Sequence, residues 1–379
     1  MRIAIDALGI HYYGGGRSAI LGLLEGLFSI DHENEYYVFL NRHEPSISAK
    51  KNAHQVISPF NNRFITRIWA QITFPNHTRN SDIIHHTKNL GVFGLSIPSV
   101  VTIHDLTTLV HPELFPLSDV LYWKTLEKRT VRNASRVIAV SQNTANDICK
   151  YYGIPTGKIQ VIFNSISPRF KPASTLDVAK VREKYHLPER YILHVGRIDL
   201  KKKLTLLVEA FALAKRISGT DFSTSLVLVG EVYHKSQDQT LQPTIERLGL
   251  TSQVLFTGGV PDNDLPAIYS GADTTISASV HEGFGLSAVE SIACGTPLIA
   301  YQAGALPEVV GEAALLVDTL DKESIASALV KINNDEALRS DLREKGLIRA
   351  QKYKGELNSR QTLKLYEQVI LENPRGHPA

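Results

Sequence analysis

Short runs rich in Val, Ile and Leu alternate with helical patterns along almost the whole chain, and this alternation constrains the fold more than any other feature. The runs are apolar at successive positions, so both faces of each strand are expected to be buried. Strands of this kind form parallel sheets that are covered by helices on both sides. The clearest runs are RIAIDAL, YYVFL, DIIHH, SVVTIHD, RVIAVS and KIQVIFN, followed by YILHVGR, SLVLVG, QVLFTG, TTISAS, PLIAY and AALLVD.

The alternation is interrupted once, which predicts two domains. A polar, proline-containing stretch, NSISPRFKPASTLD, separates the two series of runs. We expect one doubly wound α/β domain over residues 1–168 and a second over residues 169–354. The C-terminal helix, residues 355–379, is expected to pack back toward the first domain. Because such sheets bind ligands beyond the carboxyl ends of their strands, the two domains are expected to face each other across a cleft.

Charge and cysteine usage exclude several classes of protein. The formal net charge of +3 is too weakly basic to indicate nucleic-acid binding. The basic excess lies in residues 1–168, with 16 Lys and Arg against 12 Asp and Glu. Cys149 and Cys294 are far apart in the sequence, which argues against a disulfide scaffold. A strand begins at the second residue and no apolar run approaches the ~20 residues of a membrane span, so a cytoplasmic protein is expected.

The stretch HEGFGLSAVESIACGTPLIA is the strongest candidate for a functional site. It follows the strand TTISAS and is predicted to form a glycine turn and then a short helix that ends at Gly295. Free backbone N–H groups at a helix start attract phosphate, and glycines let a ligand approach the backbone closely. Glu282 and Glu290 flank this turn, and ionised carboxylates suit the hydroxyl groups of a ribose or a sugar.

Two cations and two competing motifs refine this prediction. Arg197 and Lys202 follow the strand YILHVGR, where a rigid guanidinium and a flexible ammonium could hold a diphosphate without a metal ion. Residues 283–288 formally match the dinucleotide fingerprint G-x-G-x-x-A, but they lie too late in the domain for it. The sequence DND at residues 262–264 resembles a metal-binding Asp-x-Asp, yet its context favours a turn with an N-cap before a helix. Lys201 and Lys203 are expected to be solvated.

Several motifs together resemble one family. VHEGFGLSAVESIACGTPLIA resembles the E-x7-E motif of retaining GT-B glycosyltransferases, especially the large family 4. YGGGRSAILGLLEGL resembles the family's glycine loop, VTIHDLTTLVHPELFP its active-site histidine segment, and VGRIDLKKKLTLLVEAF its diphosphate site. The likeness covers nearly the whole chain. One departure is FNSIS, where many relatives have Asn-Gly after the strand.

The resemblance implies a role for each matching residue. The GT-B fold places two Rossmann-like domains around a nucleotide-sugar donor, and no metal is required. The first domain would bind the acceptor and the second the donor. The implied catalytic residues are His104, which would reach the sugar, Arg197 and Lys202, which would hold the diphosphate, and Glu282, which would fix the sugar. The implied donor-binding residues are Gly15, Gly16, Val260, Phe284, Gly285, Leu286 and Glu290, with Glu290 on the ribose and Val260 near the base.

The resemblance also implies a substrate class, and it leaves alternatives open. A hexose would move from a nucleotide sugar to a glycan or lipid-linked acceptor, with retention of configuration. GDP-mannose and a cell-surface polysaccharide or lipopolysaccharide are the preferred donor and acceptor, so the chain would be a mannosyltransferase. A UDP-glucose-dependent glucosyltransferase, a GT-B sugar-nucleotide epimerase and a non-catalytic nucleotide-sugar binder are the alternatives. No cofactor is expected to stay bound.

The segment RFITRIWAQITF allows two interpretations. Its arginines and aromatic residues, including Arg67, Phe64 and Trp69, could make peripheral contact with a membrane that carries a lipid-linked acceptor. An ordinary amphipathic helix that packs on the sheet is the preferred interpretation.

Overall fold

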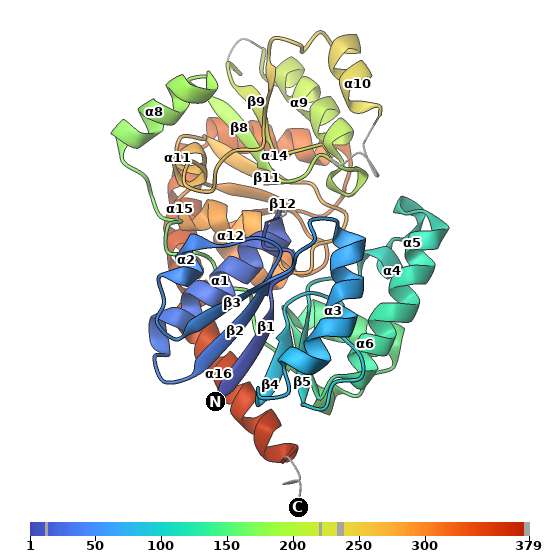
Figure 1. Ribbon diagram of the computed structural model, residues 1–379. Coiled ribbons are helices and arrows are strands. Elements are labelled where there is room, and N and C mark those ends of the chain that lie inside the picture. Colours follow the sequence, from blue (N-terminus) through green and yellow to red (C-terminus); the bar gives the residue numbers. More distant parts are fainter. Residues whose placement is uncertain (12–13, 220–221, 233–238, 375–379) are drawn as a thin grey trace, which may run out of the picture. The chain divides into compact units, whose positions relative to one another are not determined.

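The computed structural model describes residues 1–11, 14–219, 222–232 and 239–374. The chain divides into two compact units: unit 1 comprises Met1–Ser167 and Lys354–Ala379, and unit 2 comprises Pro168–Tyr353. Each unit contains a parallel sheet with helices on both faces (Figure 1), so the predicted pair of α/β domains is confirmed. None of the helices in the described ranges is both long enough and apolar enough to cross a membrane.

The described sheet of unit 1 has the strand order β3-β2-β1-β4-β5-β6-β7, and neighbouring strands run parallel. The order reverses between β1 and β4, which makes the carboxyl ends of these two strands the expected ligand position. The strands are β1 (Arg2–Asp6), β2 (Glu35–Leu40), β3 (Ala53–Ile57), β4 (Ile83–His86), β5 (Ser99–Ile103), β6 (Arg136–Ala139) and β7 (Ile159–Val161).

Helices cover the two faces of this sheet according to the alternation of side chains along the strands. Ile3 and Ile5 of β1 point to the face covered by α1 and α16, whereas Ala4 points to the face covered by α3. Helices α6 and α7 lie on the α3 side, against β5 and β6. Figure 1 shows α16 beside α1 on one face of the sheet. The helices are α1 (Gly15–Ile30), α2 (Pro45–Ser48), α3 (Arg63–His77), α4 (Thr107–Val110), α5 (Leu117–Tyr122), α6 (Lys128–Asn133), α7 (Gln142–Tyr152) and α16 (Gly355–Glu372).

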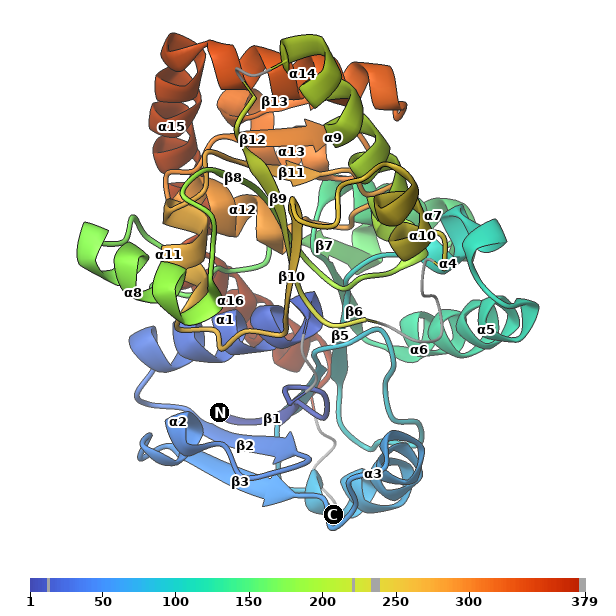
Figure 2. The same cartoon turned by 90° about the horizontal axis from the view of Figure 1, so that it is seen from above.

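Unit 2 repeats this architecture with the described strand order β10-β9-β8-β11-β12-β13, and its switch point lies between β8 and β11. Helices α9, α10 and α14 cover one face and α8 and α11 the other, and Figure 2 shows α9 next to α14. The strands are β8 (Tyr191–Val195), β9 (Ser225–Val229), β10 (Val254–Gly258), β11 (Thr274–Ser277), β12 (Leu298–Tyr301) and β13 (Leu315–Val317). The helices are α8 (Thr175–Tyr185), α9 (Leu204–Ser218), α10 (Leu241–Arg247), α11 (Leu265–Ser270), α12 (Leu286–Ala293), α13 (Leu306–Val310), α14 (Lys322–Asn334) and α15 (Glu336–Ala350).

Candidate functional site

The candidate site in unit 2 lies at the carboxyl ends of β8 and β11, which are neighbours in the sheet. Arg197 and a 3-10 turn, Leu200–Lys202, follow β8, and the glycine turn at residues 281–285 follows β11. The Val280 N–H donates to the Lys201 carbonyl at 3.0 Å, so the two loops are joined directly. The strand, glycine turn and helix predicted for this stretch are therefore present, with α12 beginning at Leu286.

Glu282 and Lys202 form an ion pair at this switch point. The Lys202 Nζ donates to Glu282 Oε1 at 2.5 Å, and the Lys201 Nζ lies 3.9 Å from Glu282 Oε2. The three side chains are only about 14–15% exposed. The expectation that Lys201 is solvated is therefore wrong, because the turn directs its side chain to the same carboxylate as Lys202.

These contacts fix the charge of each group at neutral pH. Burial raises the pKa of Glu282, but the ammonium groups of Lys202 and Lys201 outweigh it and lower the pKa to about 2. His194 of β8 is buried, and burial together with the nearby Lys202 lowers its pKa to about 4. Glu282 is therefore an ionised acceptor and His194 is neutral. The resulting set of charges offers one carboxylate for hydroxyl groups and two ammonium groups for an anion.

Two glycines allow the turn to take this shape. Gly285 has a φ of 83°, and a Cβ on it would lie 2.5 Å from the Leu306 side chain. Gly304 has a φ of 57°, and a Cβ on it would lie 2.3 Å from the Glu282 carbonyl oxygen. The Ala305 N–H donates to that same carbonyl at 2.8 Å. The loop after β12 thus holds the backbone of Glu282 in place.

The start of α12 presents backbone N–H groups next to Glu282. The first N–H groups of a helix have no partner within the helix, and Gly285 at the N-cap position contributes no side-chain cap. Phe284 is buried and packs edge-on against Tyr353 at 5.2 Å between ring centroids. Leu286 is half-buried. The aromatic contact anchors the turn, so its amides are held in place for an anion or a polar group.

Glu290 lies one turn into α12 and is buried at 5% exposure. Its Oε2 accepts a hydrogen bond of 2.9 Å from the Tyr269 hydroxyl of α11. Tyr269 was not predicted to take part in the site, because LPAIYS, the sequence of α11, has the ordinary pattern of a packing helix. The phenol holds the carboxylate of Glu290 in one orientation on α12.

The remaining predicted residues of unit 2 have different surroundings. Arg197 is 49% exposed, and its Nη2 lies 3.8 Å from Oδ2 of the buried Asp199. Val260 is buried in the core between β9 and α11. Asp264 precedes α11 as expected, but its side chain does not cap the helix. It accepts from Lys184 Nζ at 2.7 Å and from the Tyr185 hydroxyl at 2.5 Å, so Asp264 connects α11 to α8.

The candidate groups of unit 1 lie near its own switch point, between β1 and β4. Gly15 and Gly16 form the first turn of α1, after Gly14 at the N-cap position; Tyr13 lies outside the described residues. Lys88, which follows β4, lies across this loop: a Cβ on Gly16 would be 3.3 Å from its Nζ. The Lys88 Nζ also donates to the Gly9 carbonyl at 3.4 Å. Sequence analysis missed Lys88, since a single lysine after a strand carries no motif.

His104 follows β5 and is held by hydrogen bonds at both its ring and its backbone. Its Nε2 donates to the Thr87 carbonyl at 2.8 Å, and its backbone N–H donates to Asn89 Oδ1 at 3.0 Å. A carbonyl only accepts, so Nε2 carries the proton and Nδ1 is an acceptor in the neutral ring. Burial lowers the pKa of His104, and the Lys88 charge acts in the same direction. A neutral His104 can accept a hydrogen bond from a sugar hydroxyl.

Asn89 connects His104 to a buried carboxyl group. Its Nδ2 donates to the Asp105 carbonyl and to Glu127 Oε1, both at 3.0 Å. Glu127 is buried and ends a single π-helical turn, Trp123–Glu127, between α5 and α6. Burial and the charge of Asp105 raise the pKa of Glu127 well above its usual range. The chain thus stays helical from Leu117 to Asn133, and the π-helical turn lies where Glu127 contacts Asn89.

Replacing Asn89 by alanine is expected to lower the turnover number about tenfold to a hundredfold, because small displacements of a positioned group cost rate. Affinity for the donor, measured by calorimetry, should change little, since the carboxylates and cations of unit 2 are untouched. Asn80→Ala, an exposed asparagine of the same unit, is the control. A fall in melting temperature with an unchanged turnover number per folded enzyme would show that Asn89 serves stability alone.

The two histidines of β4, His85 and His86, have structural partners. His85 contacts the Tyr366 hydroxyl at 2.5 Å and the Thr102 hydroxyl at 2.7 Å, which ties α16 to the sheet. His86 contacts the Asp6 carboxylate at 3.2 Å. His85 and His104 line the same cavity of about 30 Å³, which is large enough for a water molecule. The partners of these histidines therefore belong to the scaffold beneath His104.

Two protein-family models match most of the chain. The model of "Glycosyltransferase Family 4" matches residues 13–170, and that of "Glycosyl transferases group 1" matches residues 177–349. O-antigen chain mannosyltransferase B of Escherichia coli is 29% identical over 287 residues, which are 76% of this chain and 74% of that protein. Serotype-specific mannosyltransferase WbdA of Escherichia coli is 27% identical over 71% of this chain, and the chain spans about a third of WbdA's length.

Solved structures show the same fold. The crystal structure of Anabaena HepE in complex with UDP and glucose superimposes with a TM-score of 0.78 at 21% identity, and the match covers 97% of this chain and 99% of HepE. WaaG, a glycosyltransferase involved in lipopolysaccharide biosynthesis, superimposes with a TM-score of 0.70 at 17% identity, over 96% of this chain and 99% of WaaG. With the two family models covering nearly all of the chain, the protein is a glycosyltransferase with the GT-B fold that uses a nucleotide sugar, and it belongs to family 4, the group 1 glycosyltransferases.

Proposed function

We propose that the enzyme transfers a mannosyl residue from GDP-mannose to a glycan or lipid-linked acceptor, with retention of configuration, in the synthesis of a cell-surface polysaccharide or lipopolysaccharide. The observation that supports it most is the largely buried pair of Lys202 and Glu282, 2.5 Å apart beside the start of α12. This pair combines a cation for a leaving diphosphate with an acceptor for sugar hydroxyls. The choice of mannose follows the mannosyltransferases of Escherichia coli that the chain is similar to.

In the proposed reaction, the bond between the anomeric carbon and the diphosphate oxygen breaks while an acceptor hydroxyl attacks the same face of the sugar. The proton of that hydroxyl passes to the leaving phosphate oxygen. Negative charge grows on the diphosphate, and Lys202, Arg197 and the α12 amides would stabilise it. These groups are fixed by the fold before reaction, so little reorganisation is needed. In this proposal the protein's own cations take the place of a metal ion.

The carboxylates and the glycine loop receive the other roles of the proposal. Glu282 accepts hydrogen bonds from the transferred sugar, and Glu290, oriented by Tyr269, accepts from the ribose. Unit 2 would thus bind the donor and unit 1 the acceptor. His104 and the first turn of α1, Gly15 and Gly16, would contact the sugar and the diphosphate. A charged nucleotide sugar does not cross a bilayer unaided, so the reaction must occur on the side of the membrane that holds the donor. We propose that this side is the cytoplasm.

A second candidate donor is UDP-glucose. The structures of Anabaena HepE, which contain UDP and glucose or UDP-glucose, superimpose on this chain over nearly its full length. At about 20% identity they support the fold and leave the base and the sugar open.

A thermal-shift screen of nucleotide sugars tests the proposed donor. GDP-mannose at 100 times its dissociation constant should add about 2.7 kcal/mol to the free energy of unfolding, and UDP-glucose should add much less. Glu290→Gln is the matched variant, since it should weaken the response to every nucleotide sugar. The opposite order of the two donors would contradict GDP-mannose. Conversion of the donor to a new nucleotide sugar without an acceptor would indicate an epimerase, and donor binding without transfer to any of a broad panel of acceptors would indicate a binding protein.

A further inference from the structure

The outer face of α3 carries an exposed row of large apolar side chains. Phe64, Ile65, Ile68 and Ile72 are 61%, 46%, 61% and 69% exposed. Their spacing of three and four residues places them on one side of the helix. Single exposed apolar residues are ordinary, but a continuous row of four marks a surface for interaction. These four residues are called the outer face of α3 below.

The outer face is not needed to attach α3 to unit 1. The opposite side of the helix holds Thr66, Ala70 and Phe74, all buried against the sheet. Trp69 packs edge-on against Phe74 at 6.0 Å between ring centroids, so it belongs largely to the inner side. The preferred interpretation of this segment as a packing helix is therefore confirmed, and the helix also has a second, exposed apolar face.

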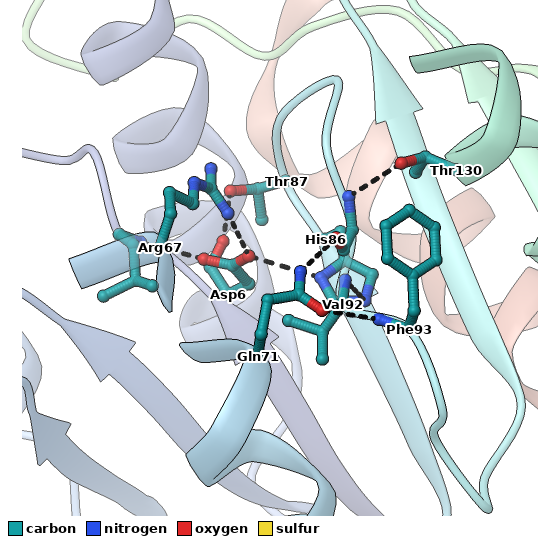
Figure 3. A network of polar contacts seen from close by, with 10 residues as sticks. Asp6, Arg67, Gln71, His86, Thr87, Val92, Phe93 and Thr130 are labelled. Carbon is teal, nitrogen blue, oxygen red and sulfur yellow. Dashed lines mark hydrogen bonds and ion pairs between the residues drawn. The ribbon is translucent and has the colours of Figure 1, made fainter. Parts of the chain in front are cut away.

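Polar contacts on the flank of α3 hold the helix in a fixed orientation (Figure 3). The Arg67 Nη1 donates to Asp6 Oδ2 at 3.1 Å, and Asp6 also accepts from His86 Nδ1 at 3.2 Å. Gln71 donates to the Gly91 carbonyl at 3.2 Å and accepts from the Phe93 N–H at 3.1 Å. Asp6 ends β1 and His86 ends β4, so α3 is attached to the switch point of unit 1. The outer face is thus held at a set angle to the edge that carries His104.

The charge around α3 indicates which partner the outer face fits. Residues 59–81 contain three arginines, Arg63, Arg67 and Arg79, and no aspartate or glutamate. The Asp6 carboxylate balances the charge of Arg67, whereas Arg79 is exposed just after the helix. A helix with an apolar face and flanking arginines matches the interface of an anionic bilayer. A twofold contact with a second copy would instead bring the same basic segments together. We propose that the outer face of α3 docks unit 1 onto an anionic lipid surface. This adds a partner to the glycosyltransferase and depends on neither the donor nor the acceptor.

Co-sedimentation with lipid vesicles tests this docking. The full chain is expected to bind phosphatidylglycerol-containing vesicles, to bind pure phosphatidylcholine vesicles far more weakly, and to release as salt is raised. Ile68→Ser with Ile72→Ser should lower the vesicle partition coefficient about tenfold or more, because two exposed apolar anchors are removed. Ile217→Ser with Ile348→Ser is the matched control, since these unit 2 isoleucines are 60% and 65% exposed, and it should bind like the wild type. Arg79→Glu should weaken binding to the anionic vesicles.

Three results would overturn the proposal. The first is a double variant that partitions like the wild type while its melting temperature shows that it is folded. The second is equal binding to neutral and anionic vesicles, which would show that the charge of the lipid does not contribute to binding. The third is a wild-type dimer, seen by light scattering, that becomes a monomer in the double variant, because the outer face would then be covered by a second copy.

Discussion

Replacing Lys202 by methionine is expected to slow sugar transfer by about a hundredfold to a thousandfold, the usual loss when one fixed group that stabilises developing charge is removed. The Lys202 ammonium lies at the switch point of unit 2, in contact with Glu282, and it is shielded from water at 15% exposure. Methionine keeps a flexible apolar stem of similar length, so the packing of the lysine methylenes near Gly196 should persist. The substitution therefore removes the charge of Lys202 and keeps most of the side-chain volume.

The turnover number per folded enzyme measures this effect, with saturating donor and acceptor. Lys203→Met is the matched control, because Lys203 is the next residue and has no ion pair with Glu282 among the contacts of the described residues. A Lys202→Met enzyme that turns over like the Lys203→Met enzyme would contradict the assigned role. A defect confined to the Michaelis constant would mean that Lys202 holds the donor equally in the ground state and the transition state.

The sequence predicts the buried central strands of each unit well, and it misses elements that are more exposed. Continuous apolar runs predict the central strands well, because burial on both faces demands Val, Ile and Leu. Strand β3 has no such run: His54 and Ile57 are exposed at the edge of the sheet, so AHQVI was not predicted as a strand. Helix α8 was also missed, since Val181 is its only buried residue among those described, and its first three residues belong to the stretch interpreted as a linker.

Side-chain partners in the site were harder to predict than the site itself. The glycines and acids of the turn are contiguous, so their pattern indicates a ligand site. The pairing of Lys202 with Glu282 joins residues 80 positions apart, and it depends on β8 and β11 being neighbours in the sheet. Lys201 looks solvated in a run of three lysines, yet the 3-10 turn directs it to the same carboxylate. Contacts made by the tertiary fold leave no local signal.

Glu282→Gln is the second substitution with a large expected effect, and it acts on both rate and stability. Glutamine has the shape of glutamate but cannot balance two ammonium groups, and it donates where the sugar hydroxyl should donate. Transfer is expected to fall about a hundredfold or more. Removing one partner of a largely buried pair also leaves Lys202 without its counter-ion, which costs stability.

The stability effect of Glu282→Gln should depend on pH in a defined direction. The pKa of Glu282 is about 2 in the folded protein and 4.5 for the free group, so folding favours the ionised form. This contribution, about 3 kcal/mol at most, is fully present above pH 4.5 and is lost as the pH falls through 2. The difference in the free energy of unfolding between wild type and Glu282→Gln should therefore be largest at pH 7 and less than about half as large at pH 3.

Urea unfolding at the two pH values, with Glu344→Gln as an exposed control, measures this difference in the free energy of unfolding. An equal difference at both values would mean that Lys202 and Lys201 do not hold Glu282 ionised, and the charge arrangement proposed for catalysis would then be wrong.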